Sequence, residues 1–353
     1  MFYQCSKCQK KWQYPIKKCP HCFAELKRIK TQKAKIIGLS KTNIPTLLHP
    51  KTPYSVLVLE DEKGNRWTQK YAPHEKSSKE YQVGDEFILE SIKDKNAVAL
   101  WRIKYDILEA IERTVELIGS LDINQDSRIV VLPTLTSPKH PHFAENTSPE
   151  FLEGLLLYLF QKGIKAENIK VAGQSFTDIP IEASIQKSQL LRVCRDFKIS
   201  PLDLAKTNFV KKEKEGLVLE LSEELFNNNL IINLPILKMG KALASENVLK
   251  FLKKENYLGL KYLHEKEKII KTLKDIMPQC LTIAEAHTIQ KPDKFTVFLG
   301  MILTSFDFLN LDRIFFEITC QEKLPRILEK IEIEKIPVLG RTIEEIQYEV
   351  GKL

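Results

Sequence analysis

The stretch "NTSPEFLEGLLLYLFQKGIKAENIKVAGQS", residues 146–175, places a helix directly before a strand. Thr147 or Ser148 can accept the first unpaired N–H groups of the helix, and Pro149 suits its first turn. Gly163 suits the end of the helix, because glycine adopts the left-handed conformation that ends many helices. The apolar residues that follow are typical of a buried strand. The stretch therefore predicts a helix–strand unit of an α/β fold.

The same alternation continues on both sides of this unit. Apolar runs of strand length occur at 128–135, 168–173, 229–235, 281–286 and 294–303. Segments with helical periodicity separate most of them. Strands that alternate with helices favour a parallel sheet, because parallel neighbours need a crossover connection. Residues 105–353 are therefore predicted to form an α/β domain with a largely parallel sheet.

Before residue 105 the sequence pattern changes to short β-like runs without helices between them. Five short β-like runs occur at 34–39, 54–60, 66–72, 86–92 and 97–103. Gly64-Asn65 suits a hairpin turn between two of these runs, and Gly84-Asp85 suits a turn before another. Several short strands within so few residues predict a small β-barrel over residues 27–104.

The first residues hold a cysteine motif, "CSKCQKKWQYPIKKCPHC", at 5–22. Cys5, Cys8, Cys19 and Cys22 form two Cys-x-x-Cys pairs, and each pair can turn two thiolates toward one ion. The motif predicts a tetrahedral metal site in a zinc ribbon over residues 1–26. Zinc fits a closed site of four thiolates, and iron in a rubredoxin-like site uses the same ligands. A closed ligand shell leaves no position for water, so the metal is expected to stabilise the fold.

Composition limits the classes of protein that the chain can belong to. It has 353 residues, 43% of them hydrophobic, and 54 Lys and Arg against 46 Asp and Glu, for a net charge of +8. That charge permits nucleic acid or phosphorylated ligands without requiring them. The apolar runs are shorter than the roughly 20 residues of a membrane helix, so no membrane span is expected. Seven cysteines, an odd number, and no evident signal peptide favour the cytoplasm over a secreted, disulfide-bonded protein.

Most of residues 1–92 resembles a zinc-ribbon and OB-fold family, domain of unknown function 35 of the acyl-CoA-associated type. The resemblance is carried by "CSKCQKKWQYPIKKCPHCFAEL", "PYSVLVLEDEKGNRW" and "YQVGDEFIL". It implies a rubredoxin-like ribbon followed by an OB-type barrel. It also implies a module that scaffolds or handles thioesters beside a catalytic partner, without catalysis of its own.

Residues 105–350 resemble a second family, domain of unknown function 362, which has an α/β fold. The residues that match its typical pattern are Pro133, Pro149, Glu150, Asn233, Pro235, Lys238, Gly259, Asp307 and Asp312. Leu132, Thr134 and Phe308 depart from that pattern, and Glu285 stands where an aspartate is usual. The resemblance implies the fold, and the departures leave open an active or a degenerate enzyme.

Candidate site residues follow from the rule that ligands bind outside the carboxyl ends of parallel strands. Lys238 follows one strand and is expected to clamp an anion. Glu285 and His287 lie two residues apart at the end of another strand, where they could perform acid–base chemistry or bind a metal. Asp307 follows the last predicted strand, where it could face the pocket or cap the next helix.

Two hypotheses from different classes result. The first is an enzyme or former enzyme that acts on a small anionic substrate, with Lys238, Glu285, His287 and Asp307 in its site. Its zinc-ribbon and OB module would dock a partner or an acyl thioester. The second is a non-catalytic nucleic-acid-binding protein that uses the ribbon and the barrel, with Trp67, Tyr71 and Tyr81 as candidate base-stacking residues.

Overall fold

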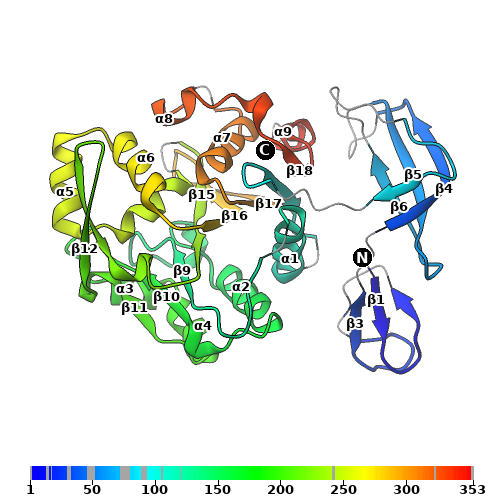
Figure 1. The fold of residues 1–353 in the computed structure, drawn as a ribbon, viewed down its shortest axis with the longest axis horizontal. Helices are drawn as coiled ribbons and strands as arrows, with labels where there is room; N and C mark the ends of the chain where they lie inside the picture. Colours follow the sequence, from blue (N-terminus) through cyan, green and yellow to red (C-terminus); the bar gives the residue numbers. More distant parts are fainter. Residues whose placement is uncertain are drawn as a thin grey trace. The chain divides into compact units, whose positions relative to one another are not determined.

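A computed structural model describes most of the chain (Figure 1). The described residues are 2–12, 16, 18–29, 33–45, 52–71, 80–88, 94–104, 106–119, 121–240, 243–321 and 323–350. The chain divides into two compact units, Met1–Ser91 and Ile92–Leu353.

The N-terminal unit begins with a small antiparallel sheet around the cysteine motif. Its strands are β1 (Phe2–Cys5), β2 (Lys11–Trp12) and β3 (Leu26–Ile29), in the order β2-β1-β3. Both neighbours of β1 run antiparallel to it. The sheet therefore connects the segments before, between and after the two cysteine pairs.

A second antiparallel sheet follows in the same unit. Its strands are β4 (Lys33–Thr42), β5 (Tyr54–Glu60), β6 (Arg66–Tyr71) and β7 (Glu86–Ile88), in the order β6-β5-β4-β7. The predicted hairpin between β5 and β6 is confirmed, with Gly64 at φ +71° in its turn. The predicted turn at Gly84 is confirmed as well, with φ +104° just before β7.

The second unit is built on a mixed sheet that has nine strands within the described residues. They are β8 (Val98–Arg102), β9 (Ile129–Pro133), β10 (Ile169–Gly173), β11 (Pro201–Asp203), β14 (Leu230–Leu234), β15 (Ile236–Lys238), β16 (Cys280–Gln290), β17 (Thr296–Ser305) and β18 (Val338–Gly340). The order is β11-β10-β9-β14-β16-β17-β8-β18, with β15 beside β16. β17 pairs antiparallel with both neighbours, and the other pairs are parallel. The predicted α/β fold with a largely parallel sheet is confirmed.

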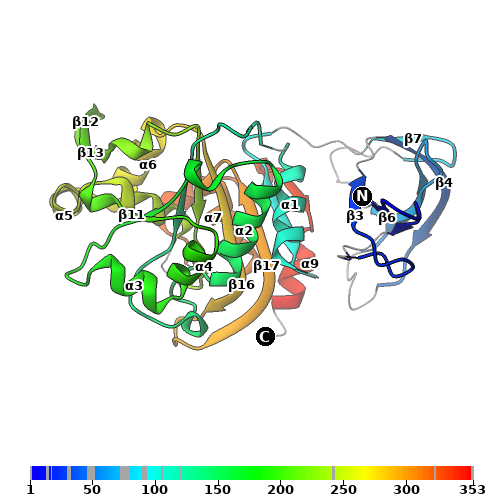
Figure 2. The same ribbon diagram turned by 90° about the horizontal axis from the view of Figure 1, so that it is seen from below.

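Helices cover both faces of this sheet (Figures 1 and 2). One face packs on α1 (Ile107–Leu117), α2 (Pro149–Gln161), α3 (Ile181–Lys187) and α4 (Leu190–Asp196). The other packs on η5 (Ala244–Phe251), α5 (Lys254–Leu263), α6 (Lys266–Ile276), α7 (Phe308–Ile318), α8 (Arg326–Glu329) and α9 (Ile343–Val350). Each face has its own hydrophobic cluster, so the unit is a three-layer α/β/α sandwich.

Helix α2 is the helix predicted from residues 146–163, and both of its ends agree with the prediction. Ser148 is the N-cap, and its hydroxyl accepts a hydrogen bond from the Phe151 N–H at 3.3 Å. Pro149 is the first helical residue, and Gly163 adopts φ +86° after the last turn. The helix buries Phe151, Leu152 and other apolar side chains against the sheet.

One predicted strand lies in the other unit. The run at 97–103 was expected to complete the barrel of residues 27–104, but β8 pairs with β17 and β18 in the large sheet. Val98, Ala99 and Leu100 are fully buried, as in a strand covered on both faces. A boundary at residue 104 therefore assigns a strand of the α/β sheet to the barrel. Within the described residues, the second sheet of the N-terminal unit has four strands.

Two segments of the α/β unit change direction at residues with a left-handed backbone. Between β10 and β11 the helical segment is split into α3 and α4 where Gln189 adopts φ +63°. The charged residues 211–214 belong to β12 (Phe209–Lys214), which pairs with β13 (Leu217–Ser222), and the chain reverses at Gly216. None of the described helices combines the length and the apolar character that a membrane span needs.

Candidate metal centre and sheet-edge site

The four predicted metal ligands converge at one point. One sulfur atom from each of Cys5, Cys8, Cys19 and Cys22 lies within 4.8 Å of the other three. The Sγ atoms of Cys5 and Cys22 are 3.3 Å apart, and those of Cys8 and Cys19 are 3.5 Å apart. All four residues are free thiols rather than disulfides. The group could hold a metal ion.

The two cysteine pairs have the same backbone geometry. In the first, the N–H of Cys5 donates to the carbonyl of Lys10, and in the second the N–H of Cys19 donates to the carbonyl of Ala24. The fourth residue after each leading cysteine, Gln9 or Phe23, adopts a left-handed φ of 58° or 57°. Such paired knuckles turn two sulfurs toward a single point, which is what a four-sulfur site needs.

Backbone dipoles favour the thiolate form of Cys5. The N–H groups of Cys8 and Lys7 point at the sulfur of Cys5, at 3.4 Å each. The N–H of Cys8 in particular lowers the pKa of the Cys5 thiol to about 6. Cys5 and Cys19 are fully buried, whereas His21 is exposed and lies outside the ligand group.

In the α/β unit, three of the predicted site residues meet around one segment, Glu145–Glu150. The Nζ of Lys238, at the end of β15, donates to the carbonyl of Glu145 at 2.9 Å. The backbone N–H of Ser148 donates to the carboxylate of Glu285 at 2.8 Å. The charge of Glu150 acts on both Glu285 and His287, so these two side chains lie near the same glutamate.

Burial shifts the titration of these groups. Glu285 is 1% exposed, and burial raises the pKa of its carboxyl to about 7 despite the hydrogen bond from Ser148. Burial lowers the pKa of His287, whose ring meets that of Phe298 edge-on with centroids 4.8 Å apart. Burial also lowers the pKa of Lys238, and the charge of Glu145 opposes that shift. Three titratable groups whose pKa values are shifted by burial thus lie at one edge of the sheet.

Asp307 is not part of this group. It is the N-cap of α7 and accepts hydrogen bonds from the N–H groups of Leu309 and Asn310, at 3.0 and 3.2 Å. Its other oxygen binds the Nζ of Lys274 at 2.6 Å. Because β17 is antiparallel, its last residue, Ser305, pairs with Thr282 near the start of β16. Asp307 therefore lies at the sheet edge opposite to the carboxyl ends of the parallel strands.

The topological switch point of the sheet is filled by polar side chains. The strand order places it between β9 and β14, where an open α/β sheet usually binds its ligand. The Thr147 hydroxyl donates to the carbonyl of Leu234 at 2.6 Å, and the Asn247 amide donates to the carbonyl of Leu132 at 2.8 Å. These bonds satisfy carbonyl groups at the ends of both strands.

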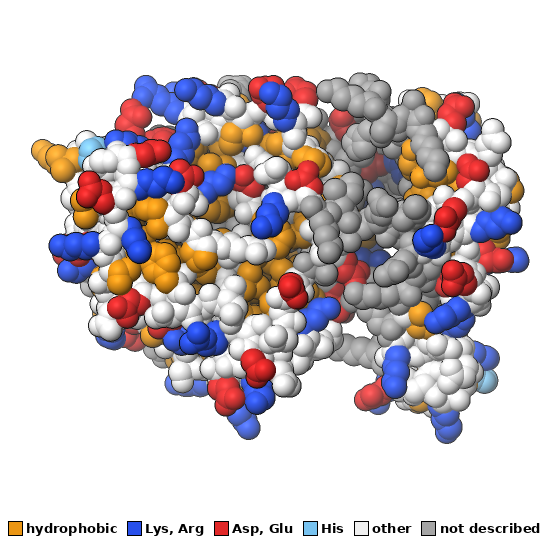
Figure 3. Space-filling model, viewed as in Figure 1, with side chains coloured by type: hydrophobic (Ala, Val, Ile, Leu, Met, Phe, Trp, Pro, Cys, Tyr) orange, Lys and Arg blue, Asp and Glu red, His pale blue; other side chains and the backbone are white. Residues whose placement is uncertain are grey.

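A cavity of about 530 Å³ lies just beyond β15. Met239, Leu243, Ile270 and other apolar side chains line it, together with an ion pair of Glu246 and Lys266 at 2.8 Å. The charge of Glu246 also acts on Lys238, and the next residue, Met239, lines the cavity. Figure 3 shows hydrophobic side chains gathered over the region of β15, α6 and α7, between charged groups of both signs.

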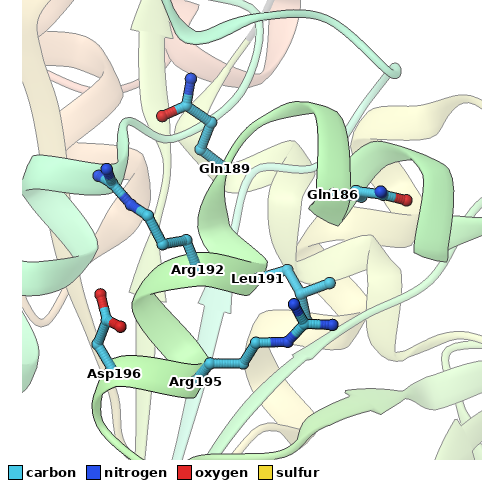
Figure 4. Close-up of a pocket in the computed structure, with 6 residues that line it drawn as sticks. All are labelled: Gln186, Gln189, Leu191, Arg192, Arg195 and Asp196. Carbon is cyan, nitrogen blue, oxygen red and sulfur yellow. The ribbon is translucent and has the colours of Figure 1, made fainter.

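A smaller hollow of about 280 Å³ lies on α3 and α4, away from these residues in the chain. Figure 4 shows its lining, in which Arg192 and Arg195 project from α4 beside Gln186 and Gln189. Both arginines are exposed, so water already solvates them. The hollow joins none of the predicted site residues.

Two features of the site had not been predicted. Asp312, fully buried on α7, accepts hydrogen bonds from the N–H groups of Ala244 and Ser245, and burial raises the pKa of its carboxyl to about 7. Lys250 lies in a lysine-rich segment but is only half-exposed, and burial lowers the pKa of its amine. The sequence carries no local signal for either environment, since the covering residues lie far away in the chain.

Comparisons with known proteins add little to this description. No protein-family model matches the chain, and no curated protein matches it. Among solved structures, the chain is similar to one titled "Ltp2-ChsH2(DUF35) aldolase", with 19% identity over 25% of this chain and 70% of that chain. The TM-score is 0.21, a value too low to assign a fold or a function.

Proposed function

We propose that residues 1–29 form a structural zinc ribbon that stabilises an accessory module. The observation that carries this proposal is the set of four sulfurs within 4.8 Å of one another. Cys5, Cys8, Cys19 and Cys22 would hold the ion, and zinc favours a closed tetrahedral shell of thiolates. With four protein ligands no position is left for a substrate, so the ion would join the two knuckles rather than perform chemistry.

Metal analysis of the purified full-length protein tests this proposal. We expect one zinc per chain and no absorption in the visible range, whereas iron in the same site would give a coloured protein. Replacement of Cys19 by serine should abolish stoichiometric zinc binding. The matched control is Cys320→Ser, because Cys320 is exposed and lies outside the group. A wild-type protein that holds no metal, or a Cys19→Ser variant that keeps it, would contradict the proposal.

We infer that the α/β unit binds a small anionic ligand at the sheet edge beside β15. The convergence of Lys238, Glu285 and His287 on the segment Glu145–Glu150 supports this, as does the cavity that starts at Met239. An ammonium group has three N–H donors, and the contact with Glu145 uses one of them. Glu285 and His287 would supply acid–base groups, and an apolar part of the ligand would enter the cavity.

Native mass spectrometry of the full-length protein should show whether a small molecule co-purifies. Thermal-shift measurements with a panel of carboxylates and phosphate esters then rank ligand classes. For the best compound, Lys238→Met should weaken binding at least tenfold, whereas Lys253→Met, which removes a lysine paired with Glu220, should not. Equal losses in both variants, or no shift with any anion, would refute the anionic site.

We propose a partner for the N-terminal module on the basis of the resemblance of residues 1–92 to domain of unknown function 35. An acyl-thioester partner is favoured over nucleic acid because of how the aromatic residues pack. Trp67, Tyr71 and Tyr81 lie against the core of the four-stranded sheet, and the rings of Tyr71 and Tyr81 meet edge-on at 4.9 Å. Rings held in that way offer little open face to a base.

A titration with single-stranded oligonucleotides at low salt separates the two partner classes. Electrostatic binding to nucleic acid is strongest at low salt and falls steeply as salt is added. We expect no measurable binding even at low ionic strength. Binding that weakens with salt, and that is lost on Trp67→Ala, would favour the nucleic-acid alternative.

A further inference from the structure

Lys250 lies beside the carboxyl end of β10 and has a fixed backbone. It belongs to η5, and its carbonyl accepts a hydrogen bond from the side-chain amide of Gln174, the residue directly after β10. The same amide donates to the carbonyl of Leu252. Gln174 is fully buried, so this clamp is shielded from water. The position belongs to the sheet edge at which α/β proteins bind ligands.

The Lys250 amine points at an aromatic surface. Its Nζ lies 4.3 Å from the centroid of the Phe176 ring, and that ring stacks on Tyr257 with centroids 4.4 Å apart at 20°. Phe176 follows β10 in the same loop as Gln174, whereas Tyr257 comes from α5. Two segments far apart in the chain therefore form the platform under this amine.

No carboxylate lies within ion-pair distance of Lys250 in the part of the chain that the structure describes. The next two lysines differ from it in this respect. Lys253 pairs with Glu220 at 3.3 Å, and Lys254 pairs with Asp178 at 3.4 Å. An ammonium that is partly removed from water and has no counter-ion is disfavoured relative to the neutral amine. Contact with the ring face offsets only part of that cost.

Burial accordingly lowers the pKa of Lys250 to about 8. At pH 7 about one tenth of such amines carry no charge, against about 0.03% for a lysine with a pKa of 10.5. The neutral amine is the nucleophile in lysine chemistry, and apolar surroundings are one of the ways in which proteins produce it. The geometry thus provides a reactive group at a ligand-binding edge.

We propose that Lys250 is a nucleophilic amine that forms an imine with an aldehyde or ketone whose apolar part packs on Phe176. The Nζ lone pair attacks the carbonyl carbon and forms a C–N bond, and one proton of the amine moves to the carbonyl oxygen, which becomes a hydroxyl group. That hydroxyl then leaves with the second amine proton as water while the C=N bond forms, so an amine and a carbonyl compound give an imine and water. The step needs no oxidant or reductant, and it is independent of the anionic ligand proposed above.

Reductive trapping of the full-length protein tests the proposal. The protein is treated briefly with benzaldehyde and sodium cyanoborohydride at pH 7.5, and modified lysines are mapped by peptide mass spectrometry. We expect Lys250 to react at least tenfold faster than Lys253 and Lys254, which share its segment but have acidic partners. Equal rates at the three lysines would overturn the assignment of a special amine.

A conservative variant separates reactivity from structure. Lys250→Arg keeps a cation over Phe176 but cannot form an imine, so its melting temperature should stay within a few degrees of the wild type while the fast reaction disappears. A fast-reacting lysine that persists in this variant would overturn the proposal. The apolar part of the inference predicts a larger preference for Lys250 with benzaldehyde than with formaldehyde. The same preference with both aldehydes would remove Phe176 from the binding role.

Discussion

The two units of this chain are stabilised by different means. In the N-terminal unit, the buried cluster of the four-stranded sheet consists of Ala34, Ile36, Leu57 and Leu59, with four aromatic residues partly buried against it. The cysteine group adds two fully buried sulfurs to the small sheet before it. The α/β unit instead has a large apolar cluster on each face of its sheet. Few side chains are thus buried in the first unit, whereas many are buried in the second.

Removal of the metal ligands should have the largest effect and should be confined to the N-terminal unit. Structural zinc contributes on the order of 10 kcal/mol to small domains, more than a few strands can supply. In Cys5→Ser we expect protease cleavage within residues 1–30, while far-UV circular dichroism stays close to the wild type. Cys320→Ser is the control. Loss of helical signal in Cys5→Ser would mean that the units are not independent.

A core truncation should produce the opposite pattern. Phe315 is fully buried on α7, and Phe315→Ala should lower the free energy of unfolding of the α/β unit by about 3–5 kcal/mol. Urea unfolding followed by circular dichroism measures this loss, and metal analysis should still find one ion per chain. Release of the metal together with the loss of stability would contradict the division of the two units.

The buried carboxyl of Glu285 predicts a pH dependence of the α/β unit. Its pKa is raised from 4.5 to about 7 by burial, so the folded protein holds this proton to a higher pH than the unfolded chain does. The unit should lose about 1–3 kcal/mol of stability as the pH rises from 5 to 7.5. Urea unfolding at both pH values measures this loss, and Glu285→Gln should reduce it while keeping an acceptor for Ser148. Glu167→Gln, at an exposed glutamate, should leave the pH dependence unchanged.

The smallest effect is expected at Asp307. Asp307→Ala removes the cap of α7 and the partner of Lys274, and should cost about 1–2 kcal/mol in urea unfolding. Asp307→Asn keeps an acceptor for the helix N–H groups and should cost about half as much. Neither variant should alter binding of the ligand at the opposite edge of the sheet. A tenfold loss of affinity in Asp307→Asn would restore Asp307 to the site.

What the sequence could predict depended on whether the signal was local. The Cys-x-x-Cys spacing and the residues that begin and end α2 are signals within short stretches of sequence, and the structure agrees with both. The direction of β17 could also have been found, because only five residues, 291–295, separate it from β16. A parallel connection needs a dozen or more residues, so a gap that short requires a hairpin. That reading would have removed Asp307 from the candidate site.

Other features had no local signal. The run that became β8 looks like the barrel strands before it, and its partner β17 begins 194 positions after its last residue. Lys250 sits in a lysine-rich segment typical of a solvated face, and Phe176, the ring that shields it, comes 74 positions earlier. Pairing and burial of this kind come from the assembled fold, so periodicity cannot reveal them.

The position of β8 has a consequence for synthesis of the protein. Its hydrogen-bonding partners, β17 and β18, emerge from the ribosome roughly two hundred residues after it. The cysteine knuckles, in contrast, need only the first 24 residues, so they can capture an ion while translation is still under way. During the interval, β8 is an apolar strand with both edges open, which is the kind of segment that aggregates. In the nascent chain, the cysteine knuckles can therefore form before β8 can pair with β17 and β18.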